Sequence, residues 1–323
     1  MNTRPELLTA EFRALSARLG RDPLQVQGPG GNTSIKGDGV MWIKASGTEL
    51  AQAEEQEIFV AVDRDAAAAE AHGAGGGSCK ETVLDPALGL RPSIETTFHA
   101  ALDWPVVVHT HSVATLTHAI SPEGCAAARE KLHGLPYSIV PYAKPGLPLT
   151  REILARNTSG TEVFILQNHG VICGGPTVEA VAERLAQVED LLKMPAQVTP
   201  WAPPADTAPD GFAWAGASWI AQNNRASALA LSGSYYPDHV VFLGPALPQK
   251  DHGGQPPAVL IPGKGVALRQ GATSSQAAMV QCLSDMLARL PADWTADPIG
   301  NAAEAELLNW DAEKYRQALA ARQ

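Results

Sequence analysis

Apolar residues recur along the chain with two different periods, and these periods predict where helices and strands lie. Helical spacing predicts helices over residues 6–19, 93–102, 123–132 and 177–193, and one more that begins near residue 151. Short apolar runs bounded by glycine and other turn residues predict strands over residues 34–36, 40–45, 57–63, 106–113, 137–143 and 162–173. This alternation predicts an α/β domain with a mixed sheet.

The remaining segments predict a loop, a linker and a second region. Residues 66–90 are rich in alanine and glycine, which is typical of a mobile surface loop. A proline-rich stretch at 199–211 predicts a linker between a catalytic domain, residues 1–198, and a smaller C-terminal α/β region, residues 212–323. That region is expected to contain helices within 211–233, 276–290 and 303–323, strands at 238–247 and 258–269, and a hairpin turn at 263–265. Its role stays open.

Composition and charge argue against several classes of function. The formal net charge of the 323 residues is −10, and no basic stripe is present that could neutralise nucleic-acid phosphates. No apolar run approaches the roughly 18 residues that cross a bilayer, and the first residues lack the pattern of a signal peptide. The four cysteines have no CxxC spacing, which favours reduced thiols. We therefore expect a cytoplasmic protein that acts on a small molecule and binds neither nucleic acid nor membrane.

Three histidines in strand-like segments predict a metal site. His109 and His111 in VVVHTHSV lie two residues apart, so on a strand both point to the same face. His169 follows in VFILQNHGVI, and a carboxylate, Glu95, lies upstream in RPSIETTF. Three imidazoles suit zinc or a similar divalent metal and leave one coordination position open for substrate. The alternative is an accidental HxH pair on a half-buried strand.

Two loops upstream of the histidines carry small polar groups that predict an anion pocket. Glycine lets the backbone approach a ligand closely, and successive amides in such turns cradle anions. Both loops also have a purely conformational interpretation, because glycine-rich turns are common. The candidate anion-binding residues in these loops and before Glu95 are Asn32, Thr33, Ser46, Gly47 and Ser93.

The succession GGNTS, KASGT, PSIET, HTH and QNHG resembles the class II aldolase/adducin family over about residues 6–195. This resemblance implies a three-layer α/β/α fold around a mainly antiparallel sheet, usually assembled as a homotetramer with fourfold symmetry. Within the family, VQGPGGNTS and the additional C-terminal half are most similar to the aldolase half of bifunctional aldolase/dehydrogenase proteins.

The resemblance also implies roles for individual residues. His109, His111 and His169 match the metal ligands, Glu95 matches the catalytic acid/base, and the anion-binding positions match Asn32, Ser46, Gly47 and Ser93. The implied reaction cleaves a carbon–carbon bond next to a carbonyl in a small hydroxylated keto compound, either a sugar phosphate or a keto acid. Such cleavage leaves an enediolate or enolate, whose charge a divalent metal stabilises.

Two departures from the family pattern keep alternatives open. Ile94 stands where the sugar-phosphate aldolases have a second serine, so one phosphate contact is missing. The segment after His111 lacks the tyrosine that those enzymes contribute across a subunit boundary; Tyr137 and Tyr142 are nearby, but a core role is the expected one for each. A sugar-phosphate 4-epimerase, a 3-keto-acid decarboxylase and a non-catalytic binding module like the adducin head remain alternatives.

Overall fold

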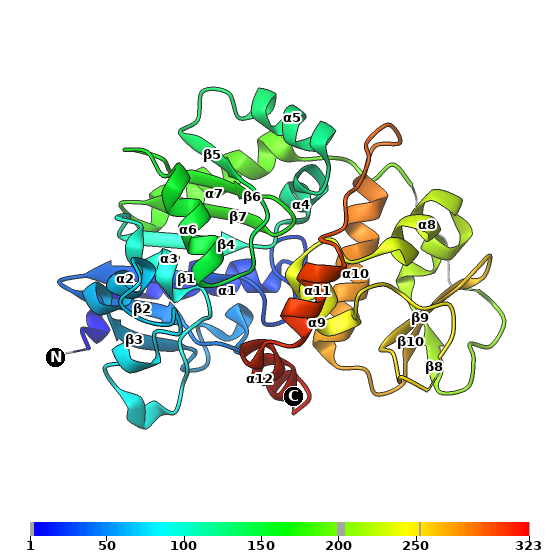
Figure 1. Cartoon of the computed structure of the whole chain (residues 1–323), viewed down its shortest axis with the longest axis horizontal. Coiled ribbons are helices and arrows are strands. Elements are labelled where there is room, and N and C mark those ends of the chain that lie inside the picture. Colours follow the sequence, from blue (N-terminus) through cyan, green and yellow to red (C-terminus); the bar gives the residue numbers. More distant parts are fainter. Residues whose placement is uncertain (1–2, 199–203, 252, 323) are drawn as a thin grey trace.

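The computed structural model describes residues 3–198, 204–251 and 253–322. Its main feature is a seven-stranded sheet with the order β3-β2-β1-β4-β7-β6-β5 (Figure 1). Every neighbouring pair is antiparallel except β5 and β6. The strands are β1 (Asn32–Gly37), β2 (Val40–Lys44), β3 (Phe59–Asp63), β4 (Val106–Thr110), β5 (Tyr137–Val140), β6 (Val163–Leu166) and β7 (Gly170–Gly175). The prediction of a mainly antiparallel sheet is confirmed.

Helices cover both faces of this sheet and make three layers. Alternate residues of β4 illustrate the arrangement, because Val106 and Val108 pack with the helices of one face whereas Val107 packs with those of the other. The first face carries α1 (Ala10–Arg21), α5 (Pro122–Lys131) and α7 (Val178–Leu192). The second carries α2 (Arg64–Ala71), α3 (Thr96–Ala101) and α6 (Leu147–Arg156). The predicted three-layer α/β/α architecture is therefore confirmed.

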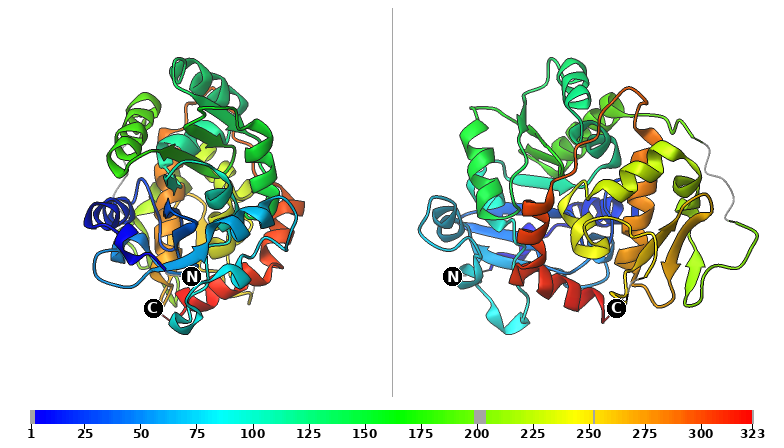
Figure 2. Two further views of the ribbon diagram at one scale, coloured as in Figure 1. Left: turned by 90° about the vertical axis from the view of Figure 1, so that its left-hand side faces the viewer. Right: turned by 45° about the vertical axis from the view of Figure 1, so that its right-hand side comes forward.

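The described part of the C-terminal region contains a small sheet and five helices, and it lies beside the three-layer region (Figure 1, Figure 2). The sheet has the order β8-β10-β9, and β9 and β10 form the predicted hairpin. Its strands are β8 (Phe212–Trp214), β9 (Ala258–Ile261) and β10 (Gly265–Arg269). The helices are α8 (Asn224–Ser232), α9 (Pro237–Leu243), α10 (Ser274–Arg289), α11 (Asn301–Leu308) and α12 (Asp311–Ala320).

One hydrophobic cluster joins the two regions. Val113, Leu116 and Ile120 on and beside α4 (Val113–Ala119) pack in the same cluster as the buried residues of α9 and α10. The predicted linker falls partly on residues 199–203, which lie outside the described residues, and the domain boundary itself stays a prediction. Within the described ranges, no helix combines the length and the apolar character needed to cross a bilayer.

Several predicted elements differ from those observed. The strand expected at 238–247 is wrong: residues 237–243 form α9, all of whose side chains are buried, so the sequence has no polar face that would reveal a period. The loop expected at 66–90 is partly helical, because Asp63 caps α2 by accepting from the amide of Ala66. Short 3-10 turns follow at Lys80–Thr82 and Pro86–Leu88.

Four other predicted elements are divided or end earlier than expected. The strand expected at 162–173 is two strands, β6 and β7, since Asn168 adopts a left-handed conformation with φ of 52° between them. The strand expected at 106–113 ends at Thr110, and Ser112 caps α4. The helix expected within 303–323 divides into α11 and α12, and the segment 211–233 contains β8 and a 3-10 turn (Gly216–Gln222) before α8.

Candidate metal centre

The sheet brings the three histidines together at one end of β4. His109 belongs to β4, His111 follows it directly, and His169 ends the turn between β6 and β7. Because β4 pairs with β7, that turn lies beside the end of β4. A Cβ atom at Gly170 would lie 2.2 Å from the carbonyl oxygen of Thr110, so only glycine allows this approach.

The three imidazoles are buried and face one common space. Each offers a ring nitrogen within 4.8 Å of the other two, and the ring centroids are 4.9–5.3 Å apart. His109 Nδ1 lies 3.0 Å from the carbonyl oxygen of Val171. Nδ1 therefore donates to this carbonyl, which leaves the lone pair on Nε2 free as a metal ligand. Burial lowers the pKa of His111 and of His169 to about 3, so both imidazoles are neutral.

Glu95 closes the fourth side of this space. It is the residue before α3, and its Oε2 lies 3.6 Å from His109 Nε2 while its Oε1 lies 3.5 Å from His169 Nε2. Burial alone would raise the pKa of Glu95, but His109, His169 and the Asn32 amide together hold it below the ordinary value. The carboxylate is therefore ionised beside the imidazoles.

Several buried polar atoms in this part of the described structure lack a hydrogen-bond partner, as expected of atoms that bind a cation. Among the described residues, His109 Nε2 and Glu95 Oε1 are buried without a hydrogen-bond partner. Buried polar atoms are rarely left unpaired, since doing so costs about 1–3 kcal/mol each. Neutral imidazole nitrogens beside a carboxylate are a donor set that divalent transition metals accept. The cluster can thus hold a divalent metal.

A chain of hydrogen bonds fixes Asn32 against Glu95. Asn32 Nδ2 donates to Glu95 Oε2 at 2.8 Å and to Ser93 Oγ at 3.2 Å. Its Oδ1 accepts from His99 Nε2, and His99 Nδ1 accepts from the Ser34 hydroxyl at 2.7 Å. His99 is thus a buried, hydrogen-bonded imidazole that acts on the site through Asn32.

The predicted anion residues do not all reach the pocket. Asn32, Ser46, Gly47 and Ser93 line the same small cavity as Glu95. Thr33 does not line it, because its side chain lies on the opposite face of β1 with Oγ1 2.8 Å from Ser16 Oγ on α1. The free volume of this cavity is about 30 Å³, which is room for only a few water molecules.

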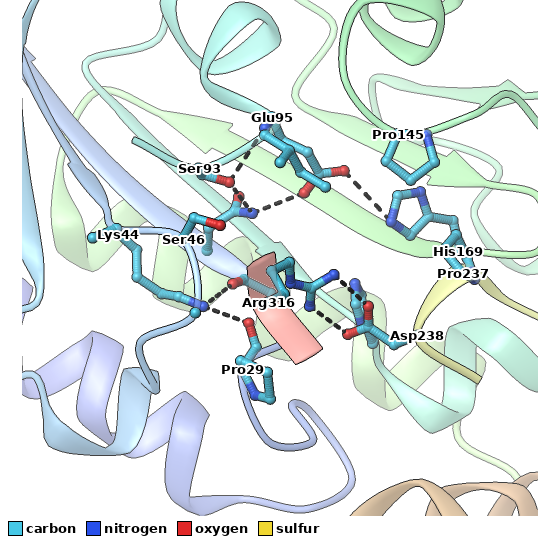
Figure 3. Close-up of a pocket in the computed structure, with 16 residues that line it drawn as sticks. Pro29, Lys44, Ser46, Ser93, Glu95, Pro145, His169, Pro237, Asp238 and Arg316 are labelled. Atoms are coloured by element: carbon cyan, nitrogen blue, oxygen red, sulfur yellow. Dashed lines mark hydrogen bonds and ion pairs between the residues drawn. The ribbon is translucent and has the colours of Figure 1, made fainter. Parts of the chain in front are cut away.

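Two charged residues of the C-terminal region complete the cavity and were missed by the sequence analysis (Figure 3). Asp238 on α9 places Oδ2 3.4 Å from His111 Nδ1. Arg316 on α12 donates to both oxygens of Asp238, at 2.8 and 3.0 Å, and to Glu313 at 2.8 Å. Burial would raise the pKa of Asp238, but Arg316 and His111 hold it well below the usual range. Because these positions are 78 residues apart, no local motif signals them.

Lys44 is a further buried cation in this cavity. Its Nζ donates to the carbonyl oxygens of Pro29 at 2.6 Å and Gly31 at 2.9 Å (Figure 3). These bonds hold the glycine-rich loop against the end of β2. Burial, assisted by the neighbouring Arg316, lowers the pKa of Lys44 to about 7.

Comparison with known proteins identifies the family and the fold. Residues 11–195 match the family model described as the Class II Aldolase and Adducin N-terminal domain. The chain belongs to the class II aldolase/adducin family. A class II aldolase domain from Thermoplasma acidophilum has the same fold, with a TM-score of 0.50 and 25% identity over 57% of this chain and 92% of that one.

Two curated proteins are similar in sequence to part of this chain. The "Uncharacterized oxidoreductase YuxG" of Bacillus subtilis is 29% identical over 53% of this chain and 27% of its own length. A 3-oxo-tetronate 4-phosphate decarboxylase of Pectobacterium atrosepticum is 29% identical over 33% of this chain and 54% of its own length. The chain thus spans about a quarter of the first relative and about half of the second.

Proposed function

We propose that this chain is a metal-dependent lyase of the aldolase type. It cleaves or forms a carbon–carbon bond next to a carbonyl in a small hydroxylated keto compound, either a sugar phosphate or a keto acid. The observation that carries this proposal is the buried group of three imidazoles with Glu95 3.5–3.6 Å from two of them.

His109, His111 and His169 would hold the metal, and three imidazoles favour zinc. When bound, the ion supplies a Lewis acid that draws electrons from the substrate carbonyl. Glu95 is the group that moves the proton, since its Oε1 is free of hydrogen bonds while Asn32 holds Oε2 in place. Ser46, Gly47 and Ser93 bind an anionic or hydroxyl group of the substrate, whereas Asn32 acts on Glu95 and Thr33 has a structural role.

Decarboxylation of a 3-keto acid is the second candidate. The similarity to 3-oxo-tetronate 4-phosphate decarboxylases of two bacteria supports it. The two reactions make the same demand on the site, because loss of carbon dioxide or of an aldehyde leaves an electron pair next to a carbonyl. They differ in the group that leaves and can be separated by the product.

The experiment is a substrate screen with the 323-residue chain loaded with Zn²⁺. Phosphorylated and free ketoses and keto acids are offered, and aldehyde and carbon dioxide are measured separately. We expect one of the two products, and we expect a chelator to abolish its release and added metal to restore it. Product release that a chelator leaves untouched would refute the proposed mechanism.

Replacement of Glu95 tests the proton-transfer role. Glu95→Gln keeps the bond from Asn32 and the size of the side chain but removes the base, so turnover should fall about 10²–10⁴-fold. Zn²⁺ content should stay unchanged, because the three imidazoles remain. Glu130→Gln, at an exposed position on α5, is the matched control. Full turnover in the Glu95 variant would remove this residue from its role.

We also propose a cytoplasmic location and a homotetrameric assembly. All four cysteines are free, buried thiols, which supports a reducing compartment. The tetramer rests on the family alone, and light scattering of the purified chain measures it.

A further inference from the structure

A second, larger cavity adjoins the one at the histidines. Ser46, Ile94 and Pro145 line both cavities, so the two are adjacent. The free volume is about 350 Å³ in the second and about 30 Å³ in the first. Small-molecule sites typically have about 300–1,000 Å³. The space at the histidines therefore admits only the reacting end of a substrate, and the second cavity is large enough for the rest.

Three cations line the second cavity, and two of them have no acidic partner. Lys80 and Arg91 form no ion pair within 4.0 Å in the described parts of the chain, and Lys144 pairs with Glu306 at 3.0 Å. Asp311 is the one acidic residue among the described residues that line the cavity, and it pairs with Lys314. Since the whole chain has a net charge of −10, this local excess of positive charge favours an anion.

Aromatic rings from the C-terminal region hold two of these cations. The guanidinium of Arg91 lies 4.0 Å from the ring centroid of Tyr315, and Lys144 Nζ lies 4.6 Å from that of Trp310. A ring positions a cation without neutralising its charge. The N–H groups of Arg91 stay available in the guanidinium plane, where they match the paired oxygens of a carboxylate or a phosphate.

We propose that this second cavity is the subsite for an anionic tail of the substrate, a phosphate or a carboxylate bound by Arg91 with Lys144 and Lys80. This inference rests on the proposed lyase function, since it places the reacting carbonyl at the histidines. The carbon chain passes Ser46 and Ile94. Ile94, where the sugar-phosphate aldolases have a serine, then contacts that chain and does not bind the anion.

Titration calorimetry on the Zn²⁺-loaded chain of 323 residues tests the subsite. The probes are inorganic phosphate and glutarate, with glycerol as an uncharged reference. Arg91→Gln should weaken binding of at least one anion roughly 10–100-fold, because a hydrogen bond to a charged group is lost. Lys144→Gln should weaken binding of the same anion, but to a smaller extent. Arg129→Gln, at an exposed position on α5, should bind both anions as tightly as the wild type does.

The pattern of losses also identifies the anion. If Arg91→Gln loses affinity for phosphate alone, the substrate is phosphorylated. If it loses affinity for glutarate alone, the substrate resembles a dicarboxylate. Measurements without Zn²⁺ must give the same difference, which separates this subsite from anion binding at the metal. Unchanged binding in Arg91→Gln, or no binding of either anion by the wild type, would overturn the subsite.

Failure of the subsite and failure of the lyase are distinguishable. If the substrate screen finds no product while Arg91→Gln still loses anion affinity, the proposed reaction is wrong and the anion site stands. If product forms in a chelator-sensitive way while Arg91→Gln binds both anions normally and keeps wild-type KM, the reaction stands and the subsite is wrong.

Discussion

At the scale of single residues, each imidazole of the cluster has a different polar neighbour. His109 donates to the backbone of β7, whereas His111 faces Asp238 and His169 faces Glu95. A carboxylate beside a ligating imidazole sets the ring orientation and raises its basicity. Asp238 can have this effect only because Arg316 holds both of its oxygens.

Replacing Asp238 by asparagine should weaken metal binding without removing a ligand. The amide keeps the shape of the side chain but loses the charge that faces His111, and loss of such a partner typically costs 10–100-fold in metal affinity. Competition with a chromophoric chelator measures the Zn²⁺ dissociation constant.

The control for this variant is Asp206→Asn, an exposed carboxylate paired with Lys264. Circular dichroism verifies that both variants are folded, because Asp238→Asn leaves Arg316 with Glu313 as its remaining carboxylate partner. Equal Zn²⁺ affinity in folded Asp238→Asn and wild type would show that Asp238 has no influence on His111.

Glu189 on α7 provides a prediction on pH and stability. Burial raises the pKa of Glu189 above the ordinary value. The hydrogen bonds with Ser112 and Gln25 lower this pKa, but their effect is smaller than that of burial. Between the pKa of Glu189 in the unfolded chain and its higher pKa in the folded chain, the folded state binds more protons than the unfolded state. The contribution of Glu189 to the free energy of unfolding is therefore fully present below the unfolded pKa and is lost as the pH rises through the folded pKa. Glu189→Gln removes this loss of stability, because glutamine does not ionise. Its melting temperature should exceed that of the wild type at pH 7.5, and the difference should shrink towards pH 4.5.

Differential scanning calorimetry at both pH values measures this effect. Glu183→Gln, an exposed position on the same helix, should melt like the wild type throughout. A difference between Glu189→Gln and wild type that is the same at both pH values would contradict ionisation as the cause.

At the scale of elements, the sequence predicts best where one face of a segment is polar. The helix predicted at residues 177–193 agrees closely with α7, because α7 keeps Val181, Leu185 and Val188 on one buried stripe. The segment of α9 has no polar face, and its apolar run predicts a strand where the structure has a helix. Tertiary burial on all sides removes the period on which sequence analysis depends.

The candidate site shows the same limit. The three histidines and Glu95 lie in motifs that are recognisable locally, and the structure brings them together. Asp238 and Arg316 lie on two helices whose pairing depends on tertiary packing, and their positions carry no spacing signal. The small polar side chains of the glycine-rich loop predict Thr33 together with Asn32 as anion-binding residues, but neighbouring strand residues face opposite sides of a sheet.

Helix α12 packs directly on the predicted anion loop, and Gly47 makes this contact possible. Gly47 has a φ of 79°, and a Cβ there would lie 2.4 Å from Leu319 Cδ1. Gly47→Ala should lower the free energy of unfolding by about 1 kcal/mol or more, through both backbone strain and displacement of Leu319.

A double-mutant cycle separates these two causes. In a Leu319→Ala background the clash is absent, so Gly47→Ala should cost less there than in the wild type, with a coupling of about 0.5 kcal/mol or more in urea unfolding. Strict additivity would mean that α12 does not press on this loop in solution.

At the scale of the whole molecule, the C-terminal region is bound to the elements that carry the histidines. Asn168, next to His169, donates to the carbonyl oxygens of Tyr235 at 3.1 Å and Asp297 at 2.8 Å. The amide of Asp297 in turn donates to the carbonyl of Ile120 at 2.7 Å. Together with the shared hydrophobic cluster, these bonds predict that residues 1–198 and 212–323 unfold as one cooperative unit.

Leu283→Ala on α10 tests this coupling, because Leu283 is fully buried in the shared cluster but belongs to the C-terminal region. Loss of a buried leucine costs about 2–5 kcal/mol. Hydrogen exchange in urea, followed by mass spectrometry, reports on α7 and α10 separately. If the chain is one unit, the variant lowers the unfolding midpoint of both helices equally. The exposed Leu191→Ala should leave both midpoints nearly unchanged. A midpoint that falls for α10 alone would establish two independent domains, and Asp238 and Arg316 could then leave the histidines without unfolding the first.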